Sequence, residues 1–151
     1  MAGFHLRPLT AEDGDAMAGW SYEGPWSVYD VGEAIEPAAD FWAVLDEDGE
    51  LAGYACYGVE ARVPGLEEVP GVLDVGVSMD PARVGQGLGR DFVGAVLDHA
   101  RTVHDAPRLR AVVQDWNQRS RRLMLSLGFE ETGEHSVAAV RYVIYERASS
   151  S

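Results

Sequence analysis

Three glycines occupy alternate positions in the middle of the sequence, in the stretch VGQGLGRDF from Val84 to Phe92. Each of Gly85, Gly87 and Gly89 would weaken a regular helix or strand by about 0.5–1 kcal/mol. The residues that follow have helical periodicity, so the glycines form a turn that leads into a helix. Such a turn directs several backbone N–H groups to one spot beside the positive end of the helix dipole. This chemistry is anion binding, and we predict that the turn holds a phosphate or pyrophosphate.

Spacing and residue type exclude the commonest phosphate-binding loops. A dinucleotide fold needs GxGxxG near its first strand, with an acidic residue about 20 residues further on. Here the pattern is GxGxG in mid-chain, after the fourth predicted strand. The P-loop and the glycine loop of protein kinases both depend on a lysine, and this sequence contains none. A turn whose glycines serve packing alone stays open as the structural alternative.

Two separate motifs resemble those of one known superfamily. MDPARVGQGLGR resembles the acetyl-CoA signature of the GNAT N-acetyltransferase superfamily, and NQRSRRLMLSLGFEETG, about 35 residues downstream, resembles its second motif. The resemblance covers roughly Phe41 to Gly133. It implies transfer of an acetyl group from acetyl-CoA to a primary amine of a small molecule or a peptide N-terminus, by direct attack and without a metal.

The resemblance also assigns residues to acetyl-CoA. The N–H groups of the turn would hold the pyrophosphate, and the end of the preceding strand would pair with pantetheine like an added strand. One of these N–H groups can also polarise the thioester carbonyl. Asn117 would lie near the pantetheine arm, while a role as a plain helix N-cap stays open. The predicted cofactor-binding residues are Val77, Ser78, Met79, Val84, Gly85, Gln86, Gly87, Leu88, Gly89, Arg90 and Asn117.

The sequence departs from the superfamily where an acid or base is usual. Met124 stands in the position of the common catalytic tyrosine, and Val112 in that of a glutamate found in some N-terminal acetyltransferases. Val84 replaces the usual Arg or Gln beside the turn. Asp74 and Tyr29 are the predicted catalytic residues, with Glu60 and Tyr22 as further candidates for a base. For Asp74, the alternative of an outward-facing structural residue stays open.

The segment WSYEGPWSVYD, Trp20 to Asp30, is dense in aromatic side chains. It corresponds in chain order to the segment that lines the acceptor pocket in the superfamily. Cation–π contacts from such side chains would bind a cationic amine, and core packing is the open alternative. The predicted acceptor-binding residues are Trp20, Tyr22, Trp26 and Tyr29.

The composition of the chain limits the kinds of partner that the protein is expected to bind. The net charge is −13, which would attract a cationic substrate and makes nucleic acid a poor partner; solubility alone stays an open explanation. No apolar window is long enough for a membrane span, and the first residues do not resemble a signal peptide, so we expect a cytoplasmic protein. The lone Cys56 is interpreted as a core residue, and His99 and His104 are placed at the far end of the helix from the turn.

The elements that position these residues follow from hydrophobic periodicity. Strands are predicted over 4–10, 41–45, 51–59, 72–79, 109–114, 129–132 and 138–145. Helices are predicted over 10–20, from the glycines to Val103, and from the cap Asn117 to Gly128. The stripe of the second helix is Phe92, Val93, Val96, Leu97 and Ala100.

We therefore expect a single α/β (α+β) domain over residues 1–147, with a loose tail at 148–151. Its GNAT-like sheet is mixed and mostly antiparallel, with six to seven strands flanked by about four helices and splayed between the fourth and fifth strands. A non-catalytic acyl-CoA-binding sensor or interaction module is the alternative function, because both usual acid/base positions are apolar. A homodimer stays open.

Overall fold

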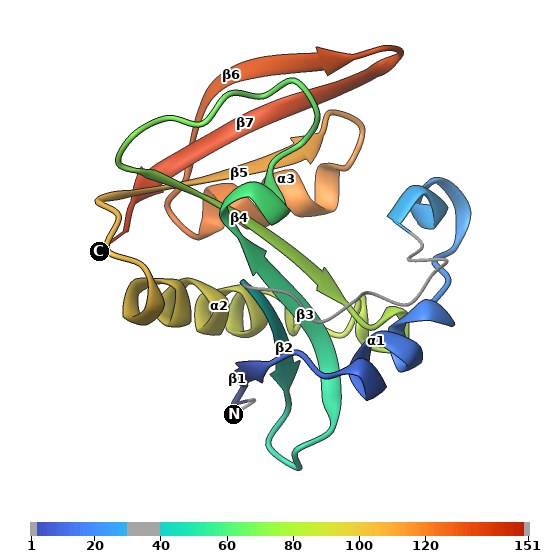
Figure 1. The fold of residues 1–151 in the computed structure, drawn as a ribbon. Helices are drawn as coiled ribbons and strands as arrows, with labels where there is room; N and C mark the ends of the chain where they lie inside the picture. The colour runs from blue at the N-terminus through green and yellow to red at the C-terminus, as the bar shows by residue number, and fades with distance from the viewer. Residues whose placement is uncertain (1–2, 30–39, 150–151) are drawn as a thin grey trace. The chain divides into compact units, whose positions relative to one another are not determined.

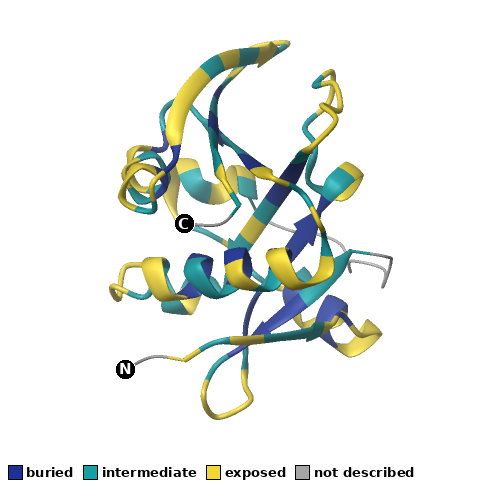
Figure 2. Cartoon of the chain, turned by 90° about the vertical axis from the view of Figure 1, so that its left-hand side faces the viewer, coloured by how far each residue is buried: buried dark blue, intermediate teal, exposed yellow. Residues whose placement is uncertain are grey.

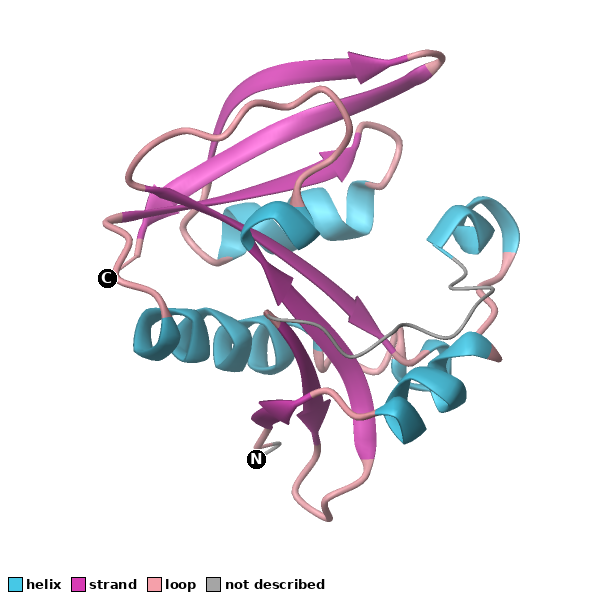
Figure 3. Cartoon of the chain, in the orientation of Figure 1, coloured by secondary structure: helices cyan, strands magenta, loops and turns pink. Residues whose placement is uncertain are grey.

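The structure is a computed structural model that describes residues 3–29 and 40–149 (Figure 1). Strands, α-helices and short 3-10 helices (η) follow one another along the chain (Figure 3). In order, the elements are β1 (His5–Pro8), α1 (Ala11–Ala18), η1 (Gly24–Tyr29), β2 (Phe41–Leu45), β3 (Leu51–Tyr57), η2 (Gly58–Ala61), β4 (Val72–Met79), η3 (Pro81–Arg83), α2 (Gly89–Val103), β5 (Arg108–Gln114), α3 (Gln118–Ser126), β6 (Glu130–Val137) and β7 (Val140–Ala148).

The strands form one mixed sheet in the order β1-β2-β3-β4-β5-β7-β6. The pairs β1/β2, β2/β3, β5/β7 and β6/β7 are antiparallel, and β4/β5 is parallel. The parallel pairing joins Val72–Asp74 to Arg108–Arg110. The predicted fold class is thus confirmed. The described residues contain three α-helices and three 3-10 helices, where about four helices were expected.

The chain divides into two compact units, which we describe separately. The first unit comprises Met1–Cys56 and Val77–Val96, and the second comprises Tyr57–Gly76 and Leu97–Ser151. In the first unit, Trp20, Phe41, Leu51 and Tyr54 pack against a buried cluster of Leu9, Met17, Ala43 and Leu45. The buried side chains of the second unit include Tyr57, Leu109, Val113, Val143 and Tyr145.

Local sequence explains where the α-helices begin and end. Thr10 and Asp13 form a capping box, in which the Asp13 N–H donates to Thr10 Oγ1 (3.2 Å) and the Thr10 N–H donates to Asp13 Oδ2 (2.9 Å). Asn117 caps α3, and Gly128 follows that helix with a φ of 86°, a value that favours glycine. Along α2, the five residues of the predicted stripe are all buried and the opposite face is exposed (Figure 2). The predicted helical periodicity is therefore confirmed.

The predicted ends of several strands were wrong, and β1 already ends at Pro8, two residues before its predicted end. β3 ends at Tyr57 and a 3-10 helix follows, so Glu60 lies exposed in η2 and does not end a strand. β6 and β7 extend beyond their predicted limits because they pair along their lengths, with a bulge between Glu131 and Gly133. β7 includes Ala148, and the Ser149 N–H donates to the Pro107 carbonyl (2.9 Å). The predicted tail beyond these residues lies outside the described chain.

Within the described ranges, no helix has the length and apolar character needed to cross a bilayer.

Candidate functional site

The glycine turn lies between η3 and α2 in the first unit. Gly85 and Gly87 have φ values of 82° and 77°, in the left-handed region that side chains with a Cβ rarely adopt. A Cβ added to either residue would meet nothing within 4 Å. The two glycines are therefore required by the backbone conformation of the turn and not by packing.

Backbone N–H groups are available where this turn enters α2. The first α-helical hydrogen bond runs from the Phe92 N–H to the Leu88 carbonyl (2.9 Å), so the amides of Gly89, Arg90 and Asp91 precede the helical ladder. The turn itself is exposed from Gly85 to Gly87. Amides that precede the hydrogen-bond ladder at the start of a 15-residue helix form the local arrangement that binds anions.

Hydrogen bonds brace the approach to the turn. The Asp80 carboxylate accepts from the Ala82 N–H (2.9 Å), and the Gln86 side-chain amide donates to the Ala82 carbonyl (2.8 Å). Arg83 pairs with Asp46 at 2.8 Å. Gln86, predicted to contact the cofactor, uses its side chain to hold the turn in place. Its predicted cofactor contact stays a prediction.

At the end of β4, the structure brings three predicted residues together. The Tyr22 phenol lies 3.0 Å from Ser78 Oγ and donates to the Met79 carbonyl at 2.5 Å. Burial raises the pKa of Tyr54 on β3 to about 12, and the nearby Ser78 hydroxyl acts in the opposite direction. Sequence reasoning missed Tyr54, because a tyrosine in the apolar stretch LAGYACYGV has the pattern of an ordinary core residue.

A close contact between strands fixes the place of Ser78. A Cβ on Gly53 of β3 would lie 2.3 Å from the Ser78 carbonyl oxygen and 2.5 Å from the Phe92 ring. The Asp80 N–H also donates to the Ala52 carbonyl of β3 at 2.8 Å. Backbone groups alternate in direction along a strand, so the N–H and C=O groups of Val77 and Met79 face away from β3. The Val77 groups and the Met79 N–H are suited to pair with an added strand, while the Met79 carbonyl accepts from Tyr22.

Asn117 lies in the second unit. Its side-chain oxygen accepts from the Ser120 N–H at 3.2 Å, and the residue is 3% exposed. The N-cap role is therefore observed, and the predicted contact with pantetheine stays a prediction.

Asp74, predicted as a base, is held by two arginines inside the second unit. Arg110 donates from Nε to Oδ1 (2.6 Å) and from Nη2 to Oδ2 (3.1 Å), and Arg62 Nε donates to Oδ2 (2.9 Å). Asp74 is 2% exposed and Arg110 is 5% exposed. A carboxylate with three donors on its two oxygens is poorly placed to take a proton from a substrate, so this geometry favours a structural role. Its catalytic role stays a prediction.

The predicted acceptor residues lie in the first unit in different settings. Trp20 packs on the core cluster described above, which agrees with the packing alternative, and Tyr22 bonds the end of β4. Trp26 and Tyr29 lie in η1 and are partly buried. Asp30, the last residue of the aromatic segment, lies outside the described residues. Tyr22 is thus joined to the predicted cofactor residues Ser78 and Met79, and the acceptor roles of all four side chains stay predictions.

Both apolar acid/base positions lie in the second unit. Met124 is 5% exposed on α3, and Val112 lies on β5 opposite Ile144 of β7. These settings support packing roles for both.

We expect Met124→Ala to lower the free energy of unfolding by about 2–5 kcal/mol, because it leaves a cavity in a buried site. At a temperature where the variant is folded, kcat should fall less than tenfold, since a thioether has no proton to give. For the wild type, kcat/KM should rise with pH as the amine deprotonates and then stay level near pH ~10, where a catalytic phenol would ionise. Met124→Leu is the volume-matched control. A hundredfold loss of kcat in folded Met124→Ala would contradict this assignment.

A second group of titratable side chains lies in the second unit. The buried Tyr57 hydroxyl lies 2.8 Å from His99 Nδ1, and the His104 ring packs edge-on to the Tyr57 ring at 5.6 Å. Burial, followed by the charge of His104, lowers the pKa of His99 below its usual value of 6.5.

This shift predicts a pH dependence of stability. The folded His99 resists protonation, so its contribution is fully present above the unfolded pKa of 6.5 and is lost as the pH falls through and below it. We expect the melting temperature of the wild type to drop more between about pH 7.5 and about pH 5.5 than that of His99→Gln. His5→Gln, at an exposed strand position of the first unit, should keep the wild-type dependence. Equal slopes for wild type and His99→Gln would contradict the assignment.

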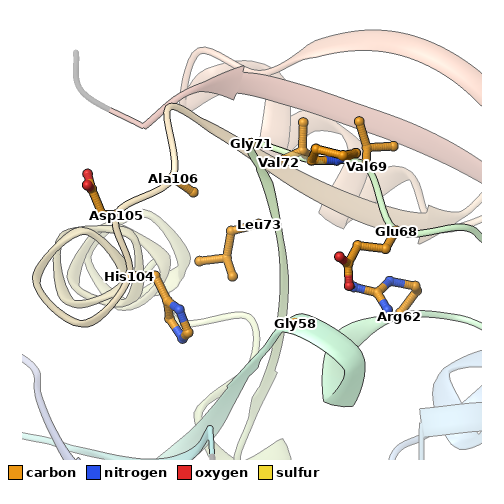
Figure 4. A pocket seen from close by; sticks show the side chains of 11 residues that line it. Gly58, Arg62, Glu68, Val69, Gly71, Val72, Leu73, His104, Asp105 and Ala106 are labelled. Carbon is orange, nitrogen blue, oxygen red and sulfur yellow. The ribbon is translucent and has the colours of Figure 1, made fainter.

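One cavity lies entirely within the second unit (Figure 4). It has a volume of about 240 Å³ and is open to solvent. Arg62 is directed toward Glu68 there, with their charged atoms 3.7 Å apart. None of the predicted site residues lines this cavity.

In the described part of the chain, no three His, Cys, Asp or Glu side chains are grouped to hold a metal ion.

Comparisons with known proteins agree with the motifs and the fold. A family model for the "Acetyltransferase (GNAT) domain" matches residues 4–130. The L-methionine sulfoximine/L-methionine sulfone acetyltransferase of Salmonella typhimurium is 30% identical over 99 residues, which cover 66% of this chain and 56% of that protein. The match thus spans little more than half of the relative's length.

Solved structures extend the similarity of fold. A GNAT-family acetyltransferase from Bacillus anthracis matches with a TM-score of 0.74 at 14% identity, over 98% of this chain and 96% of that one. The aminoglycoside acetyltransferase AAC(6')-Ib in complex with coenzyme A matches with a TM-score of 0.75 at 22% identity, over 97% and 95% of the two chains. Since the family model covers most of the sequence, this chain belongs to the GNAT acetyltransferase family.

Proposed function

We propose that this protein is an N-acetyltransferase that moves an acetyl group from acetyl-CoA to a primary amine by direct attack. The observation that carries the proposal is the turn with Gly85 and Gly87 at positive φ, which leads into the first amides of α2. In a chain of the GNAT family, this arrangement fits the pyrophosphate of CoA. The solved AAC(6')-Ib structure, which resembles this fold, is a complex with coenzyme A.

Backbone groups of the turn and of β4 would bind acetyl-CoA and assist the transfer. Amides from Gly85 to Arg90 would bind the pyrophosphate, and the outward backbone groups of Val77 and the Met79 N–H would pair with pantetheine. An N–H of this strand end would polarise the thioester carbonyl. The departing thiol has a pKa near ~8.5, so it can leave with little help from a general acid. The amine must lose a proton before or during attack, which water can accept.

The test is release of free CoA thiol from acetyl-CoA in the presence of a broad panel of primary amines, including small polyamines, amino acids and peptides. Thiol release that depends on both enzyme and amine supports the transferase. Binding of acetyl-CoA without release with any amine would indicate a non-catalytic acyl-CoA-binding module. Displacement of CoA by ATP or NAD would indicate a general nucleotide site instead.

The net charge of −13 suggests that the acceptor is cationic. We expect the apparent KM for the acceptor to rise with ionic strength, because salt screens attraction between exposed charges. The KM for acetyl-CoA should rise less. An acceptor KM that does not respond to salt would indicate that the acidic surface serves solubility alone. A cytoplasmic location and a homodimer both stay predictions.

A further inference from the structure

Three hydroxyl groups from distant parts of the sequence meet in the first unit, at the end of β4. Tyr22 comes from the segment between α1 and η1, Tyr54 from β3, and Ser78 from β4. Tyr22 Oη lies 3.0 Å from Ser78 Oγ, and the Ser78 hydroxyl lowers the pKa of Tyr54 against the larger effect of burial. We name Tyr22, Tyr54 and Ser78 the hydroxyl chain.

The Met79 carbonyl fixes the direction in which Tyr22 donates its proton. A carbonyl only accepts hydrogen bonds, so the single Tyr22 proton goes to the Met79 oxygen 2.5 Å away. The Tyr22 oxygen then accepts from the Ser78 hydroxyl.

The hydroxyl chain ends on a peptide group that is held from both sides. Its carbonyl, from Met79, accepts from Tyr22, while its N–H, from Asp80, donates to the Ala52 carbonyl of β3 at 2.8 Å. The plane of this peptide is therefore set by one side chain and one neighbouring strand. The Met79 N–H belongs to the preceding peptide, between Ser78 and Met79, and it faces away from β3, as the Met79 carbonyl does.

We propose that Tyr22 is a positioning residue for the acyl donor, which it serves by holding the end of β4 through the hydroxyl chain. This inference rests on the proposed function. With its carbonyl occupied by Tyr22, Met79 offers its N–H as the outward group at the end of the strand. The pantetheine arm then pairs with β4 in one register, which places the thioester beside that N–H. A misplacement of about 1 Å at a reacting centre can cost about a hundredfold in rate, so this register matters for transfer.

The experiment compares two ligands by calorimetry: acetyl-CoA, and the nucleotide half of CoA without pantetheine (3'-phosphoadenosine 5'-diphosphate). For Tyr22→Phe, which removes only the hydroxyl, we expect acetyl-CoA affinity to fall at least fivefold and nucleotide affinity to stay unchanged. The kcat should fall at least tenfold at saturating acetyl-CoA. Ser78→Ala should act in the same direction, and Ser78→Thr, which keeps a hydroxyl, should restore most of the difference. Tyr142→Phe, on β7 in the second unit, should match the wild type.

The outcomes separate this inference from the proposed function. If the wild type binds acetyl-CoA and releases thiol, but Tyr22→Phe keeps the wild-type ratio of the two affinities, the positioning role is overturned and the function stands. An equal loss of both affinities also overturns it, because the effect then lies outside the end of β4. If the wild type binds neither ligand, the proposed function itself fails.

Discussion

Replacing Gly87 by Val is expected to weaken acetyl-CoA binding at least tenfold, or about 1.4 kcal/mol. Gly87 has a φ of 77°, and this left-handed conformation costs a residue with a Cβ roughly 1–2 kcal/mol. A β-branched side chain tolerates it least. The turn would relax toward a negative φ and redirect the amides that face the pyrophosphate. Titration calorimetry with the folded variant measures the change.

Gly49 offers a matched control for this substitution. It lies in the same unit, in the turn between β2 and β3, with a φ of 79° and nothing within 4 Å of an added Cβ. Gly49→Val should therefore cost similar stability and leave acetyl-CoA affinity unchanged. Wild-type affinity in Gly87→Val would remove the basis of the proposed donor site. Equal losses of affinity in both variants would assign the effect to general strain in the unit.

The largest expected loss of stability comes from Asp74→Ala, at about 3–5 kcal/mol. Asp74 neutralises Arg110, which is 5% exposed, and also pairs with Arg62. Removing the carboxylate leaves buried guanidinium charge without a counter-charge, and this penalty exceeds the value of the pair itself. Denaturant unfolding of the variant and the wild type gives the difference. Asp98→Ala, which removes the exposed partner of Arg101 on α2, should change stability little.

A second substitution at this position distinguishes a structural role of Asp74 from a catalytic role. Asp74→Asn keeps the shape of the side chain and removes its charge, so it should lose most of the same stability. Per folded molecule, its kcat should stay within tenfold of the wild type. If kcat falls a hundredfold while the variant remains folded, with acetyl-CoA affinity unchanged, the structural interpretation is wrong and Asp74 acts as the base.

Sequence alone was sufficient for features that depend on neighbouring residues. The predicted cap of α3 needs only Asn117, whose side chain accepts from the Ser120 N–H three positions on. The buried stripe of α2 follows from the 3.6-residue period, and the alternating glycines indicated a turn whose φ values are indeed positive at Gly85 and Gly87. Short-range sterics and periodicity determine such features, so tertiary context changes them little. The two motifs were equally local, and they led to the correct family.

Only the tertiary structure decided what the polar side chains on the strands do. Asp74 finds its partners 12 and 36 residues away, and Tyr22 finds Ser78 and Met79 at separations of 56 and 57 residues. Tyr54 enters the hydroxyl chain because its strand packs beside β4 at Gly53, where the absence of a Cβ permits close approach. Strand alternation tells which residues share a face, but not which distant groups cover that face. Which partner a buried polar group finds depends on long-range packing. For this reason Asp74, predicted as a base from the sequence, lies in an ion pair in the structure. For the same reason no sequence pattern indicated the hydroxyl chain.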